Sequence, residues 1–248
     1  QTCALPIFGY WAALNYVPVP GFGPGELSAK HKDGNLGAFL DRLLVGRHLN
    51  SKSWDGTGLI GFWPATVNVL AGTLVGNLLR CRRRPIFKVW LLCSSGVGLT
   101  LVGWVWGGCP GFNGFLILGE PALSATACPI NKPLWTSSYV VLTTGLGSIA
   151  LAGCYWLIDV AGYQSWSLPF RTFGLNALLA FVGAGLLHSA LRKLHLSDGR
   201  TPHDSVYTAL FAPLADPYLS SLLFALSYML LWFGLMAFLT YKKIVVKL

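Results

Sequence analysis

The chain has 248 residues, of which 54% are hydrophobic and only 11% are charged. Soluble domains carry about 25% charged residues, so this composition argues against a soluble globular protein. The net charge of +9 would suit a nucleic-acid partner. However, the basic residues lie mostly in short connections between apolar stretches, which is typical of the cytoplasmic loops of membrane proteins. We therefore expect membrane lipids, and no nucleic acid, as partners.

Long stretches without charged residues recur along the chain. Asp, Glu, Lys and Arg are absent from residues 58–79, 89–109, 134–158, 172–191 and 218–241. About 20 apolar residues in a helix cross the roughly 30 Å hydrocarbon layer. We predict an all-α fold: a polytopic membrane helix bundle with five full transmembrane helices plus one partial N-terminal helix. The partial helix covers 8–17, and the full spans cover 58–79, 89–106, 134–158, 168–190 and 219–241.

The connection between the first two full spans sets the orientation. It contains Arg80, Arg82, Arg83, Arg84 and Lys88, and clusters of Lys and Arg in short loops face the cytoplasm. Alternation then places the C-terminus in the cytoplasm as well, and residues 18–57, 107–133 and 191–217 outside.

The first outer loop contains its own structural signals. Residues 18–25 are rich in Pro and Gly, which favours turns. Asn35 can cap a short helix over Leu36–Val45 that ends at Gly46. On that helix five apolar side chains share one face, and Asp41 and Arg42 lie on the other side. Such a helix is expected to lie in the membrane interface. The apolar face consists of Leu36, Phe39, Leu40, Leu43 and Leu44.

We expect residues 1–7 to differ from the rest of the chain in origin. Their seven residues, QTCALPI, can be encoded by a string that reads as a common sequencing-library adapter. There is no initiator Met, charged segment or cleavage site of a signal peptide. We therefore expect residues 1–7 to be non-native and residues 8–248 to be the C-terminal part of a longer membrane domain.

Polar residues at membrane depth are the candidates for function, because an unpaired polar group is costly there. Asn68 and Asn77 fall in the 58–79 span, Thr143 and Thr144 in the 134–158 span, and Asn176 in the 168–190 span. Each can form a hydrogen bond between helices or contact a substrate.

The segment 129–139 concentrates polar groups at the outer end of a span. It brings the amide of Asn131, the ammonium of Lys132 and the indole of Trp135 together before three hydroxyl residues. One interpretation is the entrance of a passage, where these side chains bind a polar group of the substrate. The other is an interfacial anchor, with Trp135 at the headgroups and Lys132 reaching water. The residues alone leave both open.

Cysteine and histidine spacing gives no metal motif. Cys109 and Cys128 flank an outer loop and could form a disulfide in an oxidising compartment. No CxxC pair or Cys/His cluster has ligand spacing, and no histidine is spaced for a triad. We expect no metal.

Several segments match, in order, the motifs of a known family. Residues 129–140, PINKPLWTSSYV, are close to PINK-LWTSSYV, and 35–49 are similar to the pattern YIDRLLL…HLY. Further similarity lies in segments 53–59, 70–76, 155–160, 173–177 and 241–244. These segments resemble the heparan-α-glucosaminide N-acetyltransferase family and its bacterial homologues. In contrast, Asp55-Gly-Thr-Gly stands where the family has Asp-Pro-Glu-Gly, and residues 107–127 form an apparent insertion.

The resemblance implies an integral-membrane acyltransferase, which we expect in a bacterial inner membrane. Acetyl-CoA would be the acyl donor, and a sugar or glycan the acceptor. The family's catalytic His and nearby Asn are expected upstream of this chain, so the chain alone is expected to be inactive. We expect Asn131, Lys132, Trp135 and Asn176 to line a passage for the acyl donor and the acceptor. Whether the chain forms a homo-oligomer stays open.

Two other functional classes fit the same residues. A transporter or flippase for a glycan or lipid intermediate would move its substrate without consuming acyl-CoA. A non-catalytic membrane scaffold is the second alternative. An upstream His with a nearby Asn at an outer helix end would favour the transferase over both.

Overall fold

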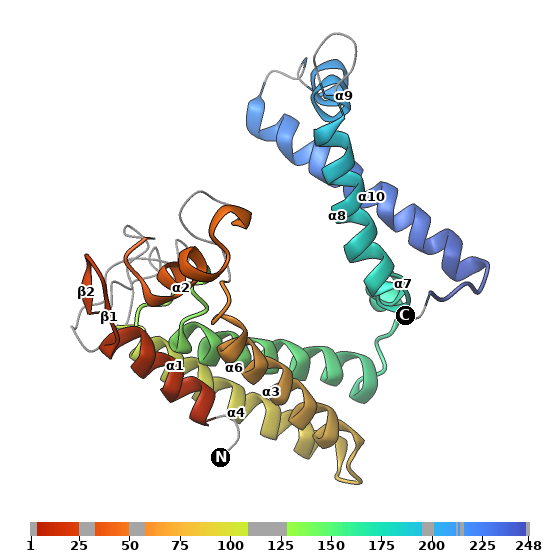
Figure 1. Cartoon of the computed structure of the whole chain (residues 1–248). Coiled ribbons are helices and arrows are strands. Elements are labelled where there is room, and N and C mark those ends of the chain that lie inside the picture. The colour runs from red at the N-terminus through yellow and green to blue at the C-terminus, as the bar shows by residue number, and fades with distance from the viewer. Residues whose placement is uncertain are drawn as a thin grey trace. The chain divides into compact units, whose positions relative to one another are not determined.

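The computed structural model describes residues 4–24, 33–49, 58–108, 128–194, 201–211, 213 and 216–246 (Figure 1). The described elements are helices and one small antiparallel hairpin. The chain divides into two compact units, Gln1–Gly162 and Tyr163–Leu248. Each unit has its own packing and is described separately.

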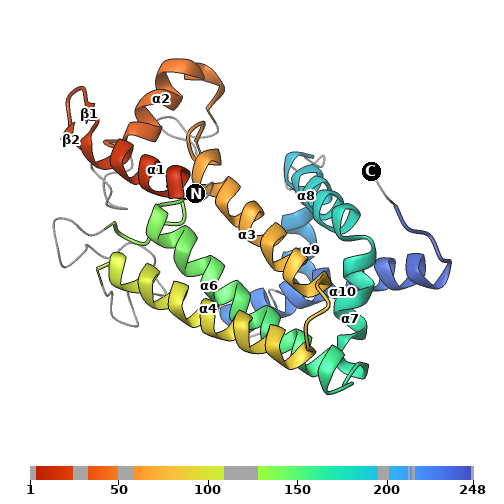
Figure 2. The same ribbon diagram turned by 90° about the horizontal axis from the view of Figure 1, so that it is seen from below.

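The described part of the first unit contains four longer helices and a segment of short helices and strands. Its helices are α1 (Ala4–Tyr16), α2 (Leu36–Leu44), η1 (Gly46–His48), α3 (Phe62–Arg80), α4 (Pro85–Trp106), α6 (Ser137–Tyr155) and η2 (Trp156–Val160). Strands β1 (Pro18–Val19) and β2 (Gly23–Pro24) pair with Val19 opposite Gly23. Figure 2 shows α4 and α6 running side by side, with α3 next to α6.

The second unit is an α-helical hairpin with a short helix toward each end. Its elements are η3 (Ser165–Ser167), α7 (Leu168–Leu175), α8 (Ala177–Lys193), α9 (Pro202–Leu210) and α10 (Pro217–Tyr241). Helices α8 and α10 cross, with α9 near one end and α7 near the other (Figure 1).

The predicted helical membrane bundle is confirmed. Within the described residues, four helices are long and apolar enough to cross a membrane, namely α3, α4, α6 with η2, and α10. The segment Ser165–Leu175 and helix α8 pass the same test together, which gives up to five spans. Thus the charge-free stretches located the membrane segments to within a few residues.

One predicted helix is broken. Residues 168–190 were expected to form one straight span, but the chain bends by 68° between Leu175 and Ala177. Asn176 leaves the helical conformation, with φ −125° and ψ 39°. Its side chain accepts a hydrogen bond from Val246 N at 2.8 Å and donates one to Ile244 O at 3.2 Å. These bonds to the C-terminal tail stabilise the break.

Helices α4 and α6 pack backbone against backbone. A Cβ atom on Gly145 would lie 2.5 Å from Thr100 N, and one on Gly103 would lie 2.5 Å from Leu142 N. Glycines on both helices therefore permit an approach that no other residue allows. Small residues promote helix association in lipid, because close packing replaces the hydrophobic driving force that operates in water.

In the second unit, α8 and α10 cross at a glycine. A Cβ atom on Gly183 would lie 2.6 Å from Trp232 Cη2, so the indole ring packs directly on the α8 backbone. Close to this crossing, Tyr228 Oη donates to Ala184 O at 2.8 Å. A glycine thus fixes the crossing point of this pair as well.

The α4–α6 contact gives a testable prediction. Gly145→Ala should destabilise the folded chain by about 1–3 kcal/mol, since its methyl group would meet backbone atoms that cannot move aside. Thermal unfolding in detergent micelles measures the effect. Gly153→Ala on the same helix is the control, because a Cβ atom there meets nothing within 4 Å. Equal melting temperatures for the two variants would contradict the predicted close contact.

Candidate functional site

The first unit contains an open cavity of about 410 Å³ between α3 and α6. Its walls are largely glycine, alanine and aliphatic side chains, with a few hydroxyls and one amide. The lining residues are Asn68, Ala71, Gly72, Val75, Gly76, Leu79, Thr143, Thr144, Gly147, Ser148 and Leu151. Its volume lies within the range of small-molecule sites, roughly 300–1,000 Å³. Because both helices are candidate membrane spans, the cavity lies at membrane depth.

A polar pair closes one end of this cavity. Thr144 Oγ1 lies 2.7 Å from Asn68 Oδ1 and 2.8 Å from Val140 O, so two acceptors share the single hydroxyl proton. No described residue accepts a hydrogen bond from Asn68 Nδ2. That N–H₂ group is therefore available to a ligand. The sequence named Asn68 and Thr144 as polar residues at membrane depth, but it gave no sign that they pair.

The other end of the cavity reaches a basic connection. Leu79 lines the cavity, and Arg80 follows it at the end of α3. The Lys88 side chain is only 7% exposed, and its Nζ donates to Leu79 O at 2.6 Å. A buried cation thus caps the last carbonyls of α3, where the helix dipole is negative.

Helix α2 confirms the predicted cap. Asn35 caps the helix as expected, with its Oδ1 accepting from Ala38 N at 2.8 Å. Asp41 lies on the buried side of the helix and is 1% exposed, while Leu43 and Leu44, on the predicted apolar face, are about two-thirds exposed. The location of this helix in the membrane interface stays a prediction.

The burial of Asp41 has a clear physical reason. Its Oδ1 accepts a hydrogen bond from Leu59 N at 2.8 Å, just before α3 begins. Gly58 adopts φ +52°, and a Cβ atom there would lie 2.7 Å from Asp41 Oδ2. A buried carboxylate needs such donors, since leaving it unpaired is costly. Asp41 therefore positions the turn that leads into the cavity-lining helix.

The segment 129–136 folds into a compact turn at the start of α6. Asn131 N donates to Thr136 Oγ1 at 3.0 Å, and Thr136 Oγ1 donates to Pro129 O at 2.7 Å. From α1, Tyr10 Oη donates to Leu134 O at 2.7 Å. These bonds join the turn to α1.

The predicted passage residues lie in two different places. Asn131 is buried, Lys132 is exposed, and the Trp135 ring packs edge-on against Tyr139 at 5.8 Å between centroids. Trp135 has φ +49°, a left-handed conformation that a bulky residue rarely adopts. Asn176 lies in the second unit and binds the C-terminal tail. The α3–α6 cavity includes none of the four, so their role in a longer passage stays a prediction.

Histidines meet at one end of the second unit. The rings of His188 and His203 are 5.6 Å apart between centroids, and His203 Nδ1 lies 3.3 Å from Asp204 Oδ1. The Thr201 hydroxyl and then His203 hydrogen-bond the Asp204 carboxylate, which lowers its pKa. Asp204 is exposed, so this pair is a local surface contact.

Other predictions fall wholly or partly outside the described residues. Cys109 and Asp55 lie outside them, and the disulfide between Cys109 and Cys128 therefore stays a prediction. Cys128 is buried, and that burial raises the pKa of its thiol. Within the described ranges, no group of three or more His, Cys, Asp or Glu side chains could hold a metal ion.

Sequence comparison with known proteins finds two distant relatives of this chain. The chain is 28% identical over 209 residues to heparan-alpha-glucosaminide N-acetyltransferase of Homo sapiens, which covers 72% of this chain. It is 27% identical over 210 residues to the Mus musculus enzyme, covering 75% of this chain. The chain is a distant relative of these N-acetyltransferases. It spans only 28% and 30% of their lengths, and no family model matches it. The resemblance predicted from the ordered motifs is confirmed.

The carboxylate of Asp41 gives a second prediction. Asp41→Ala should destabilise the chain by about 1–3 kcal/mol, because the partly buried hydrogen bond from Leu59 N loses its acceptor. Asp33→Ala is the control, since Asp33 is exposed in the same outer segment and surface substitutions usually change stability by less than about 0.5 kcal/mol. Thermal unfolding in detergent compares the two. If Asp41→Ala melts together with the control, the carboxylate does not hold the turn.

Proposed function

We propose that this chain is the C-terminal part of a membrane acyltransferase. The enzyme transfers an acetyl group from acetyl-CoA, across the membrane, to the amine or hydroxyl of a sugar or glycan. It lies in a bacterial inner membrane with its C-terminus in the cytoplasm. The distant relationship to two N-acetyltransferases supports the reaction class, and the apolar helices support the membrane location.

The cavity between α3 and α6 is the observation that carries the proposal. An acyl group that crosses a membrane on a carrier needs space between the helices. Gly72, Gly76 and Gly147 leave such a space because they lack side chains. Deep in the cavity, Asn68 and Thr144 can hold a polar group by hydrogen bonds, which are strong where the surroundings are apolar.

The chemistry is attack by an amine or hydroxyl on a thioester. It requires a base that removes a proton from the acceptor and donors that stabilise the developing oxyanion. We assign the base to a part of the enzyme outside these 248 residues, as the family resemblance implies. The role of this chain is to form one wall of the passage, and the chain alone is predicted to be inactive.

Acetyl transfer by the native protein that contains this chain tests the proposal. Membrane vesicles would receive labelled acetyl-CoA on one side and a glucosamine-terminated acceptor on the other. Asn131→Ala and Asn176→Ala should each lower kcat/KM by about tenfold, which corresponds to roughly 1.4 kcal/mol of transition-state stabilisation. Asn77→Ala is the control, because Asn77 is exposed on α3 outside the cavity lining.

Two results would contradict the proposal in different ways. Unchanged kinetics in both variants, at normal expression, would remove Asn131 and Asn176 from the passage. Movement of the acceptor across the membrane without consumption of acetyl-CoA would replace the transferase with a transporter.

A further inference from the structure

We propose that the connection between α3 and α4, together with the first two turns of α4, binds an anionic phospholipid. Arginine side chains of the connection hold the phosphate group of the lipid, and exposed apolar side chains of α4 contact its hydrocarbon chains. This lipid contact involves one end of the first unit and does not depend on the proposed acetyl transfer.

The connection carries positive charge that no described carboxylate neutralises. Its exposed arginines are Arg80, Arg82, Arg83 and Arg84. No described carboxylate oxygen lies within 4.0 Å of their nitrogens. Asp159, in the η2 segment that contacts α4, is exposed and forms no ion pair with them. Because guanidinium groups bind phosphate oxygens through two parallel hydrogen bonds, these arginines suit a phosphate ligand.

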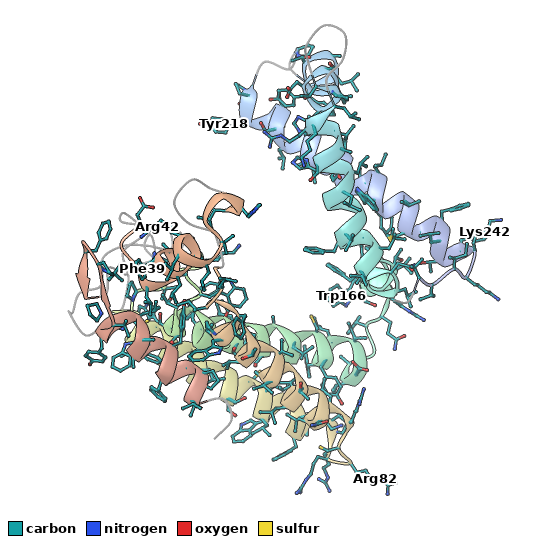
Figure 3. All side chains as sticks on the ribbon, in the orientation of Figure 1. Phe39, Arg42, Arg82, Trp166, Tyr218 and Lys242 are labelled. Atoms are coloured by element: carbon teal, nitrogen blue, oxygen red, sulfur yellow. The ribbon has the colours of Figure 1, made fainter. Side chains whose placement is uncertain are left out.

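Arg83 brings this charge next to the apolar surface of α4. Its guanidinium carbon lies 6.0 Å from the centroid of the Phe87 ring, at the limit of a cation–π contact. The Phe87 side chain is itself 43% exposed. In contrast, Arg82 lies at the tip of the connection and points away from the helices (Figure 3). The arginines therefore extend from the helix surface outward.

The surface of α4 next to these arginines is apolar and exposed. Ile86 and Trp90 lie one turn apart on the helix and are 58% and 65% exposed. Since α4 is a candidate membrane span, these side chains meet lipid rather than water. Tryptophan is common at the level of the headgroups, where polar and apolar surroundings meet. A charged surface and an apolar one thus adjoin within two turns of α4.

The backbone of the connection is held at both ends. Cys81 N donates to Asn77 O at 3.0 Å, which ends α3, and α4 begins at Pro85. The buried Lys88 side chain joins the two helices, because its Nζ donates to Leu79 O at 2.6 Å. Such a fixed turn presents its arginines with little loss of backbone freedom on binding.

An anionic phospholipid matches both parts of this surface. Its phosphate suits the arginines, and its hydrocarbon chains cover the exposed side chains of Phe87 and Trp90. A soluble phosphate would leave those side chains uncovered, and a zwitterionic lipid would bring an ammonium group that the arginines repel. Basic residues beside a membrane helix attract anionic lipids for the same electrostatic reason.

Equilibrium binding of fluorescent phosphatidylglycerol to the purified 248-residue chain, in neutral detergent, tests the proposal. Phosphatidylcholine with the same hydrocarbon chains should bind about tenfold more weakly. The double variant Arg82→Gln and Arg83→Gln should lower the affinity for phosphatidylglycerol by about tenfold and remove this preference. Arg192→Gln is the matched control, because Arg192 is an exposed arginine at the end of α8 in the other unit.

A tryptophan variant tests the apolar part of the surface independently. Trp90→Ala should lower the affinity for phosphatidylglycerol by about fivefold, because the lipid chains lose an apolar contact. Trp63→Ala should leave the affinity unchanged. It is the matched control, since Trp63 is 50% exposed and lies at the opposite end of α3 from the connection.

Four results would each overturn the proposal. Equal affinities for phosphatidylglycerol and phosphatidylcholine would remove the preference for an anionic headgroup, and an unchanged affinity in the double arginine variant would remove the phosphate contact. An unchanged affinity in Trp90→Ala would remove the hydrocarbon contact. Glycerophosphoglycerol is the same headgroup without hydrocarbon chains. If it displaced the lipid at equal concentration, the surface would be a site for soluble phosphates and not for a lipid.

Discussion

The backbone contact between α4 and α6 is the constraint on which the first unit depends. Gly96 and Gly103 on one helix and Gly145 on the other remove the side chains that would hold the helices apart. In lipid, such close packing is a main source of helix association. Because α4 holds α6 firmly from one side, the opposite side of α6 can face α3 across a cavity without collapse of the bundle.

Polar groups line part of that cavity. Asn68 and Thr144 pair near one end, and Ser148 lines the wall one turn further along α6. The rest of the wall is apolar and rich in glycine, and the arginine-rich connection follows its last α3 residue, Leu79.

The sequence predicted features that depend on local or average properties. Charge-free stretches located the spans because hydropathy is a sum over neighbouring residues, and Asn35 was correctly placed as a cap because capping involves residues three apart. Features that depend on distant partners were missed. Asp41 is buried because of Leu59, and the helix breaks at Asn176 because of Val246, 70 residues later. The Asn68–Thr144 pair likewise joins residues 76 apart, which no periodicity reveals.

Chemical accessibility along α3 tests the central claim most directly. In a chain whose native cysteines have been replaced, we would measure the rate at which a water-soluble thiol reagent, added from the predicted cytoplasmic side, modifies Gly76→Cys, Gly72→Cys and Asn68→Cys. The account predicts that rates fall in that order and that Val69→Cys, exposed outside the cavity lining, stays unreactive. Equal rates at all four positions would contradict a passage between α3 and α6.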